Sequence, residues 1–279
     1  MSARKACVMG HPIAHSRSPM LHGYWLKTLG IDGTYELADV APAEFPDFLR
    51  HLRERGYVGG NVTVPHKGAA FETVDRREAA AEAIGAVNTV WYEGARLVGG
   101  NTDAYGFLAN LDAAVPGWNE GARRAVVLGA GGAARAIVYA LLGRVDRVDI
   151  VNRTTARAHD LATHFGPAVS AHDFAALPTL LPLADILVNA TSLGMTGKAK
   201  FDLDIRALKP GAVVYDIVYV PLETDLLKTA KTHGHPTVDG LGMLLHQAVP
   251  AFARWFGVTP KVTAELRALL EADIQAKSG

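Results

Sequence analysis

The sequence has little of what several classes of protein require. It contains one cysteine, Cys7, so no internal disulfide can form, and we expect a reducing, cytoplasmic location. Its 28 basic and 28 acidic residues cancel, which leaves no electrostatic footprint for nucleic acid or for an anionic membrane. No apolar run approaches the roughly 18–20 residues of a membrane span. The N-terminal stretch also lacks an apolar segment long enough for a signal peptide.

The length and the apolar content predict two folded domains. At roughly 100–200 residues per domain, 279 residues suggest two, and 49% of them are apolar. Strand-like and helical stretches alternate, which indicates α/β layers. In the middle of the chain the strand-like runs are continuously apolar and β-branched, as in parallel strands buried on both faces. We place the boundaries near residues 103 and 240, so that 1–103 with 241–279 forms one domain and 104–240 the other.

A glycine-rich loop in the middle of the chain predicts a dinucleotide site. A strand over 124–128 runs directly into Gly129, Gly131 and Ala134, which match G-x-G-x-x-G/A and open a helix. The first glycine permits the tight turn, and the second lets the backbone approach a pyrophosphate. The small third residue allows the helix to pack closely on the strand. Backbone N–H groups at the helix N-terminus then face the phosphates.

The end of the next strand indicates which dinucleotide binds. An NAD site usually has an acidic residue there, which binds the ribose 2′-hydroxyl. Here the strand ends in Asn152-Arg153-Thr154, and Arg157 follows one helical turn later. A guanidinium suits a 2′-phosphate, which it can bind with two parallel hydrogen bonds. The sequence therefore favours NADP over NAD.

Polar residues in the first domain form four further clusters: Ser16 with Ser18, Asn61 with Thr63 and Lys67, Asn88, and Asp103. Each also has a plainer explanation. Ser18 and Asp103 suit helix N-caps, and a lysine is usually a surface residue. Lys67, however, opens an apparent helix, where the helix dipole disfavours a cation. Asn88 lies in an apolar segment, where an amide needs a partner. Physical reasoning alone predicts a possible ligand site here and no more.

Eight motifs in order resemble the signatures of the shikimate dehydrogenase family, over roughly residues 7 to 257. They are G-H-P-I-A-H-S-R-S-P, N-V-T-V-P-H-K, I-G-A-V-N-T, G-N-T-D, G-A-G-G-A-A-R-A, N-R-T, D-I-V-Y-V-P and G-L-G-M-L-L-H-Q. The resemblance implies a two-domain α/β fold, in which the first and last segments form a substrate domain and the middle forms a Rossmann-type NADP-binding domain. It also implies reversible, NADPH-dependent reduction of 3-dehydroshikimate to shikimate, in the pathway to chorismate and the aromatic amino acids.

The resemblance assigns roles to individual residues. Lys67 and Asp103 would flank the reacting C3 oxygen, with Lys67 acting either as an acid/base group or as a fixed charge. The implied substrate-binding residues are Ser16, Ser18, Asn61, Thr63, Asn88, Tyr219 and Gln247. The implied cofactor-binding residues are Gly129, Ala130, Gly131, Gly132, Ala133, Asn152, Arg153, Thr154 and Arg157, with Thr191, Ile217 and Gly240 near the ribose and nicotinamide. Ile217 stands where many relatives have Met.

Two other functions remain open at this point. One is a quinate/shikimate dehydrogenase that prefers NAD, which Arg153 and Arg157 argue against. The other is a non-catalytic NADP sensor, which has no reason to keep Lys67 together with Asp103. The eleven histidines show no metal-binding spacing, so we expect no metal. The expected partner is the small-molecule substrate, and the chain is expected to be a monomer or a homodimer.

Overall fold

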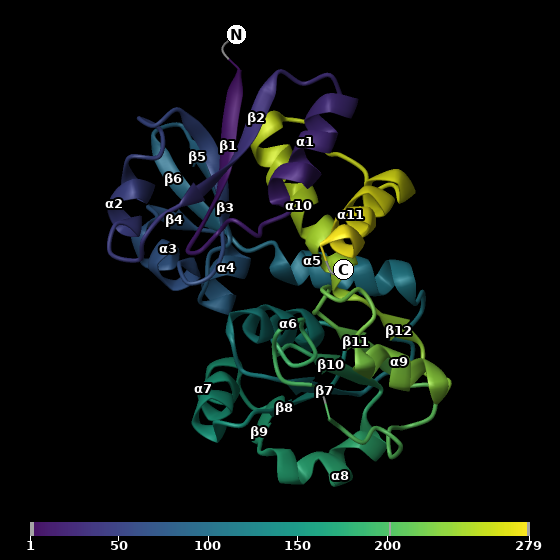
Figure 1. The fold of residues 1–279 in the computed structure, drawn as a ribbon. Coiled ribbons are helices and arrows are strands. Elements are labelled where there is room, and N and C mark those ends of the chain that lie inside the picture. Colours follow the sequence, from purple (N-terminus) through teal and green to yellow (C-terminus); the bar gives the residue numbers. More distant parts are fainter. Residues whose placement is uncertain (1–2, 201, 278–279) are drawn as a thin grey trace. The chain divides into compact units, whose positions relative to one another are not determined.

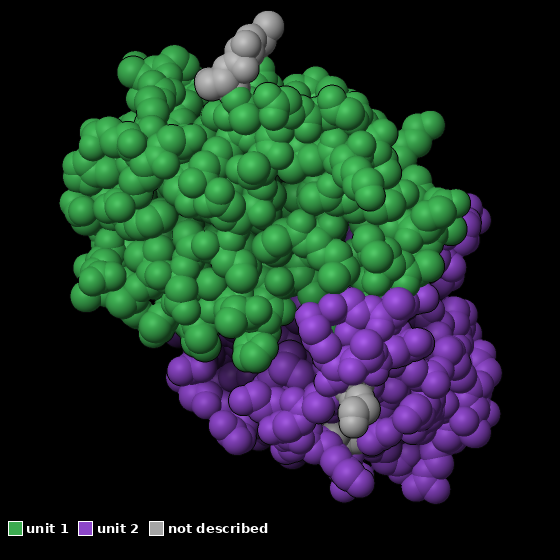
Figure 2. All heavy atoms as spheres, turned by 45° about the horizontal axis from the view of Figure 1, so that its top comes forward, with its two compact units in different colours: residues 1–103, 247–270 green, residues 104–246, 271–279 purple. Residues whose placement is uncertain are grey.

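The computed structural model describes residues 3–200 and 202–277, which belong to two compact units (Figure 2). The first unit contains residues 1–103 and 247–270, and the second contains residues 104–246 and 271–279. Among the described residues, 241–246 and 271–277 therefore fall in the second unit, whereas the sequence predicts them in the first. Close packing explains part of the difference, because Gly242 lies directly against Asn110 of the second unit. None of the described helices is long and apolar enough to cross a membrane.

A mixed six-stranded sheet forms the centre of the first unit (Figure 1). Its order is β2-β1-β3-β5-β6-β4. The strands are β1 (Arg4–Gly10), β2 (Gly33–Asp39), β3 (Tyr57–Val62), β4 (Arg76–Arg77), β5 (Thr89–Glu93) and β6 (Arg96–Gly100). Strand β1 runs parallel to β2 and β3, while β5 is antiparallel to both β3 and β6. Because β1, β2 and β3 are parallel, their carboxyl ends meet at one edge of the sheet.

Helices pack around this sheet. They are α1 (Ser18–Thr28), α2 (Phe45–Arg50), α3 (Lys67–Thr73) and α4 (Ala79–Ile84), together with most of α10 (Gly240–Phe256) and α11 (Ala264–Ala276). Helix α1 begins at Ser18, so Arg17 and not the predicted Ser18 takes the cap position. Buried aromatic side chains join α1 to α10: the rings of Trp25 and Phe252 lie 5.3 Å apart. The imidazole of His22 stacks on Tyr35 of β2 at 4.1 Å.

The second unit contains a six-stranded sheet in the order β12-β11-β10-β7-β8-β9, and every neighbouring pair is parallel. Its strands are β7 (Arg124–Leu128), β8 (Arg147–Val151), β9 (Val169–His172), β10 (Ile186–Asn189), β11 (Val213–Asp216) and β12 (Thr237–Val238). All residues of β10 and β11 are buried, as expected for central strands covered on both faces. The predicted Rossmann-type parallel sheet is therefore confirmed.

The helices of the second unit are α5 (Asp103–Ala114), which starts at the unit boundary, α6 (Gly132–Leu142), α7 (Thr155–Phe165), α8 (Leu177–Leu180) and α9 (Asp225–Thr232). Two short 3-10 helices, Phe174–Ala176 and Leu181–Leu183, flank α8. Apolar side chains from β7, β10 and β11 pack with α8 and α9 in one buried cluster. This core supports the carboxyl ends of the parallel strands, which is where open α/β sheets bind ligands.

Candidate functional site

The loop after β7 has the geometry of a pyrophosphate site. Gly129 adopts a φ of +106°, and a Cβ there would lie 2.9 Å from Thr191 Cγ2 and 3.0 Å from the Ala190 carbonyl oxygen. A Cβ built on Gly131 or Gly132 would instead meet no heavy atom within 4 Å in the described part of the chain. The first backbone N–H groups of α6 receive no side-chain cap and adjoin this open space. The loop therefore fits a dinucleotide phosphate.

The end of β8 presents two arginines. Arg153 and Arg157 are exposed at the start of α7, and neither pairs with a carboxylate among residues 3–200 and 202–277. Asn152 Nδ2 donates to the Thr154 carbonyl oxygen at 2.8 Å and holds the turn between strand and helix. Asp149 is buried within β8 and bound by Arg124, so it is not available to a ribose. The arrangement suits a 2′-phosphate better than a 2′-hydroxyl.

In the first unit, Lys67 and Asp103 form an ion pair. Lys67 is the first residue of α3 and Asp103 the first of α5, and Lys67 Nζ lies 2.5 Å from Asp103 Oδ2. Their side chains are 21% and 11% exposed, so both groups are largely shielded and still reachable. The carboxylate offsets the unfavourable position of a cation at a helix N-terminus. Asp103 thus serves more than the helix-capping role that local sequence allows.

Asn88 holds the other oxygen of this carboxylate. Its Nδ2 donates to Asp103 Oδ1 at 2.8 Å and to Thr102 Oγ1 at 3.1 Å. Its Oδ1 accepts from the Thr102 amide at 2.8 Å and from Thr89 Oγ1 at 2.9 Å. Thr102 Oγ1 in turn donates to Gln247 Oε1 at 3.3 Å. A continuous network therefore links Lys67, through Asp103 and Asn88, to Gln247 of α10.

Asn61 is turned inward rather than toward solvent. It is 6% exposed, and its Nδ2 donates to Thr89 Oγ1 at 3.1 Å and to the Asn88 carbonyl oxygen at 3.3 Å. Its Oδ1 accepts from the Tyr35 hydroxyl at 2.7 Å. Burial raises the pKa of Tyr35 well above its usual value, so this hydroxyl stays a donor. Both amide hydrogens of Asn61 are therefore occupied by protein groups.

The remaining predicted residues lie at the ends of strands and helices. Ser16 and Ser18 are at the start of α1, where Ser16 Oγ accepts from the Ser18 amide at 3.3 Å. Thr63 is partly exposed just after β3. In the second unit, Thr191 follows β10, and Gly240 follows β12. Ile217 and Tyr219 both follow β11; Ile217 is predicted to bind the cofactor and Tyr219 the substrate. Thr63, Thr191 and Ile217 thus follow the carboxyl ends of parallel strands, whereas Asn88 precedes the antiparallel strand β5 and Gln247 lies on α10.

Sequence reasoning did not name three residues of these networks: Tyr35, Thr89 and Thr102. Thr89 connects Asn61 to Asn88 through its hydroxyl group, and Thr102 connects Asn88 to Gln247. The Tyr35 hydroxyl donates to Asn61. The signal that identified Asn88, a polar residue in an apolar segment, also applies to Thr89 and to Tyr35. It reveals a buried polar group but not the partner of that group.

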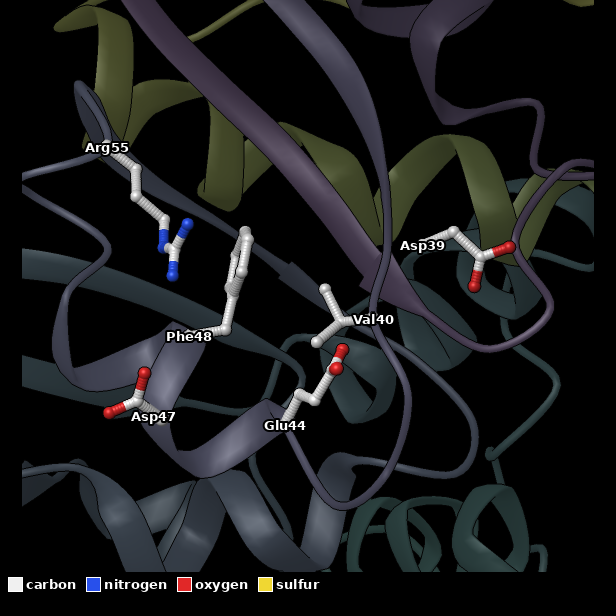
Figure 3. A pocket seen from close by; sticks show the side chains of 6 residues that line it. All are labelled: Asp39, Val40, Glu44, Asp47, Phe48 and Arg55. Atoms are coloured by element: carbon white, nitrogen blue, oxygen red, sulfur yellow. The ribbon is translucent and has the colours of Figure 1, made fainter.

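A separate pocket of about 410 Å³ lies beside α2 in the first unit. It is lined by Asp39, Val40, Glu44, Asp47, Phe48 and Arg55 (Figure 3). The Arg55 guanidinium sits 4.7 Å from the centre of the Phe48 ring. None of the predicted site residues lines this pocket. Among the described residues, moreover, no group of three His, Cys, Asp or Glu side chains could hold a metal ion.

Three family models match successive parts of the chain. The shikimate dehydrogenase substrate binding domain matches residues 8–90, and the shikimate/quinate 5-dehydrogenase model matches residues 116–196. The shikimate 5′-dehydrogenase C-terminal domain matches residues 240–270. The first match covers the Lys67 segment, and the second covers the glycine-rich loop and the two arginines.

Whole proteins and solved structures agree with these matches. The chain is 57% identical over 278 residues to the shikimate dehydrogenase (NADP+) of Mesorhizobium japonicum, and the aligned region covers 99% of each protein. It is 55% identical over 275 residues to the shikimate dehydrogenase (NADP+) of Azorhizobium caulinodans, and the aligned region covers 98% of each protein. The shikimate 5-dehydrogenase of Thermus thermophilus, solved with NADP(H) and shikimate, has a TM-score of 0.83 at 37% identity, covering 98% of this chain and 99% of its own. The quinate dehydrogenase of Corynebacterium glutamicum, solved with NAD, has a TM-score of 0.89 at 31% identity, covering 97% and 99%. Given this coverage and the paired Lys67 and Asp103, the chain belongs to the shikimate dehydrogenase family.

Proposed function

We propose that this protein catalyses the reversible reduction of 3-dehydroshikimate to shikimate by NADPH. The observation that carries the proposal is the shielded Lys67–Asp103 pair, whose carboxylate is fixed by Asn88. The relatives above 50% identity bear the name of this activity. The open glycine-rich loop and the two exposed arginines that follow β8 supply the features that NADP requires.

Lys67 and Asp103 control the protonation and the charge of the reacting substrate oxygen. When bound, NADPH supplies the hydride that the carbonyl carbon accepts. As the substrate oxygen gains negative charge, the Lys67 ammonium either donates a proton to it and regains one from solvent, or stabilises it as a fixed charge while solvent supplies the proton. The Asp103 carboxylate keeps the ammonium in place and accepts a hydrogen bond from the substrate hydroxyl in the reverse direction. Because Asn88 holds Asp103 beforehand, little reorganisation is needed.

We assign NADP binding to the second unit and most of the substrate binding to the first. Ser16, Ser18 and Thr63 offer hydroxyl groups, and Gln247 offers its amide, for the carboxylate and ring hydroxyls of shikimate. Tyr219 is assigned to the same ligand. Asn61 and Asn88 contribute to this site mainly through the neighbours that they hold, because their amide hydrogens already have protein partners.

The remaining assignments concern the cofactor. The pyrophosphate is assigned to Gly129, Ala130, Gly131, Gly132 and Ala133, and the adenosine 2′-phosphate to Asn152, Arg153, Thr154 and Arg157. Thr191, Ile217 and Gly240 are assigned to the nicotinamide end. A cytoplasmic location and a monomeric or dimeric state stay predictions from the sequence.

The first test is an initial-rate assay with four pairs of substrates: shikimate or quinate, each with NADP or NAD. We expect turnover largely confined to shikimate with NADP. Turnover of quinate with NAD would keep the fold and the chemistry but refute the cofactor assignment. No turnover in any pair, with NADP still bound, would refute the proposed reaction and favour a sensor.

The second test replaces Lys67 by Ala. A positioned acid/base group typically contributes roughly 10²–10⁴ to kcat, so Lys67→Ala should lose about that much with little change in KM. Lys209→Ala is a matched control, because Lys209 also pairs with an aspartate, Asp185, away from the proposed site. The control should keep its kcat. Near-normal turnover of Lys67→Ala would contradict the assignment.

A further inference from the structure

A buried carboxylate at the end of β11 is not used by the mechanism above. Asp216 is 0% exposed. Its Oδ1 accepts from Asn189 Nδ2 at 2.9 Å and from the Val218 amide at 3.0 Å, and its Oδ2 accepts from Thr224 Oγ1 at 2.7 Å. No cation among the described residues pairs with it. The carboxylate thus joins the ends of two adjacent strands, β10 and β11, to the residue that caps α9.

The Asn189 side of this network leads into the loop after β10. Asn189 Oδ1 accepts from the Thr191 amide at 3.1 Å and from Thr191 Oγ1 at 2.7 Å. Thr191 Oγ1 accepts in turn from the Leu193 amide at 3.0 Å. Asn189 Nδ2 donates to Asp216 Oδ1 and also to the Leu193 carbonyl oxygen at 3.1 Å, so Asp216 is one of the two acceptors that orient this amide. The orientation of the amide in turn determines where the backbone and hydroxyl of Thr191 lie.

The Val218 side leads into the segment after β11. The bond from the Val218 amide to Asp216 Oδ1 closes a tight turn around Ile217. The backbone of Gly240 packs closely against this turn, because a Cβ at position 240 would lie only 2.0 Å from the Ile217 carbonyl oxygen. A further backbone bond, from the Thr196 amide to the Val220 carbonyl oxygen at 2.8 Å, ties the two loops together.

We propose that Asp216 is a positioning residue for the nicotinamide end of the cofactor site. It fixes the two loops that carry Thr191 and Ile217, and it acts through Asn189 and the Val218 amide rather than by touching the cofactor. The proposal rests on the proposed function, which places those loops beside NADP. An apolar side chain at 216 would remove the acceptor of the Val218 amide, of the Thr224 hydroxyl and of one of the two Asn189 amide hydrogens. The two loops would then lose their common anchor.

The test compares Asp216→Ala and Asp216→Asn with the wild-type protein. Asparagine can keep the network, because its Oδ1 accepts from Asn189 and Val218 while its Nδ2 donates to Thr224 Oγ1. Asp149→Ala is the control: Asp149 is 1% exposed in β8 of the same sheet, but it is bound to Arg124 and His172 instead of to a loop. NADPH affinity is measured by fluorescence titration without shikimate, and the two KM values are measured separately.

We expect Asp216→Ala to weaken NADPH binding by about tenfold or more, while the KM for shikimate changes by no more than about twofold. Asp216→Asn should stay within about threefold of the wild-type affinity. An equal loss of affinity in Asp149→Ala, or an equal rise in both KM values, would overturn the proposal. So would an asparagine variant as weak as the alanine variant.

If Asp216→Ala fails to fold, Thr224→Val removes one of the three bonds and leaves the other two. It should show a smaller loss of NADPH affinity in the same direction, and an unchanged affinity would overturn the proposal. The experiments distinguish a wrong reaction from a wrong role for Asp216. A wild-type protein that binds NADPH but does not turn over shikimate refutes only the proposed reaction. Full turnover with unaltered affinity in the Asp216 variants refutes the positioning role alone.

Discussion

Replacing Asp216 by Asn should stabilise the folded protein, and the gain should grow with pH. Burial raises the pKa of Asp216 from 3.8 to about 6, because no cation of the described residues offsets the lost hydration. The folded state therefore binds this proton more tightly than the unfolded state does. The stability that this proton contributes is fully present below pH 3.8 and is lost as the pH rises through about 6. Asparagine is neutral throughout and makes a similar set of hydrogen bonds.

The size of the effect follows from the shift in pKa. A shift of roughly two units corresponds to about 3 kcal/mol of unfolding free energy at pH 8, and to about half of that at pH 5. In a protein of this size, about 3 kcal/mol raises the melting temperature by about 6–12 °C. Urea and thermal unfolding of both proteins at pH 5 and pH 8 provide the measurement. The difference between the two proteins cancels the titration of every other group.

Two results would refute this reasoning. One is a difference in unfolding free energy that is the same at pH 5 and at pH 8, which would mean that Asp216 does not titrate between them. The other is a less stable Asp216→Asn protein at pH 8. That result would mean that the carboxylate gains more from its three donors than it loses through burial.

Three further outcomes are expected. Burial lowers the pKa of His22 from 6.5 to about 3, so the free energy of unfolding falls as the pH drops below 6.5. His22→Phe should remove about 2 kcal/mol of the unfolding free energy that the wild-type protein loses between pH 7 and pH 5, as measured by urea unfolding. Gly242→Ala would place a Cβ 1.7 Å from Asn110 Oδ1 and should lower the unfolding free energy by about 1–3 kcal/mol. Replacing Arg153 and Arg157 together by Ala should raise the KM for NADP by about tenfold or more and leave that for NAD unchanged.

The sequence predicts the second unit better than the first. Its strands are continuous apolar runs, and the spacing of Gly129, Gly131 and Ala134 specifies a strand, a turn and a helix in one motif. In the first unit the sequence does not reveal the hairpin of β5 and β6, because β6 ends in two glycines and β5 mixes polar with aromatic residues. The edge strands β4, β9 and β12 contain two to four residues, too few to show a period.

Helix length also departs from the sequence pattern in one segment. Apolar residues at helical spacing predict a helix over residues 42–56, but α2 covers only Phe45–Arg50. Leu52 continues the apolar spacing and is fully buried, although it lies in the turn that leads to β3. Burial of one face therefore extends past the helix end, because a turn can direct a side chain into the same core. The spacing of apolar residues indicates which side chains are buried, but it does not show where the helical backbone hydrogen bonds end.

For the site, the sequence identifies polar residues but cannot reveal which of them face one another. Asn61 and Asn88 appear alike in sequence as amides available to a ligand, yet the hydrogens of both amides bind protein acceptors. An amide that is already satisfied gains little from a new partner, since it must first break an existing bond. Its contribution is to hold Asp103 and the neighbouring threonines in position before a substrate arrives. The rigidity of the Lys67–Asp103 pair therefore comes from residues that a substrate need not touch.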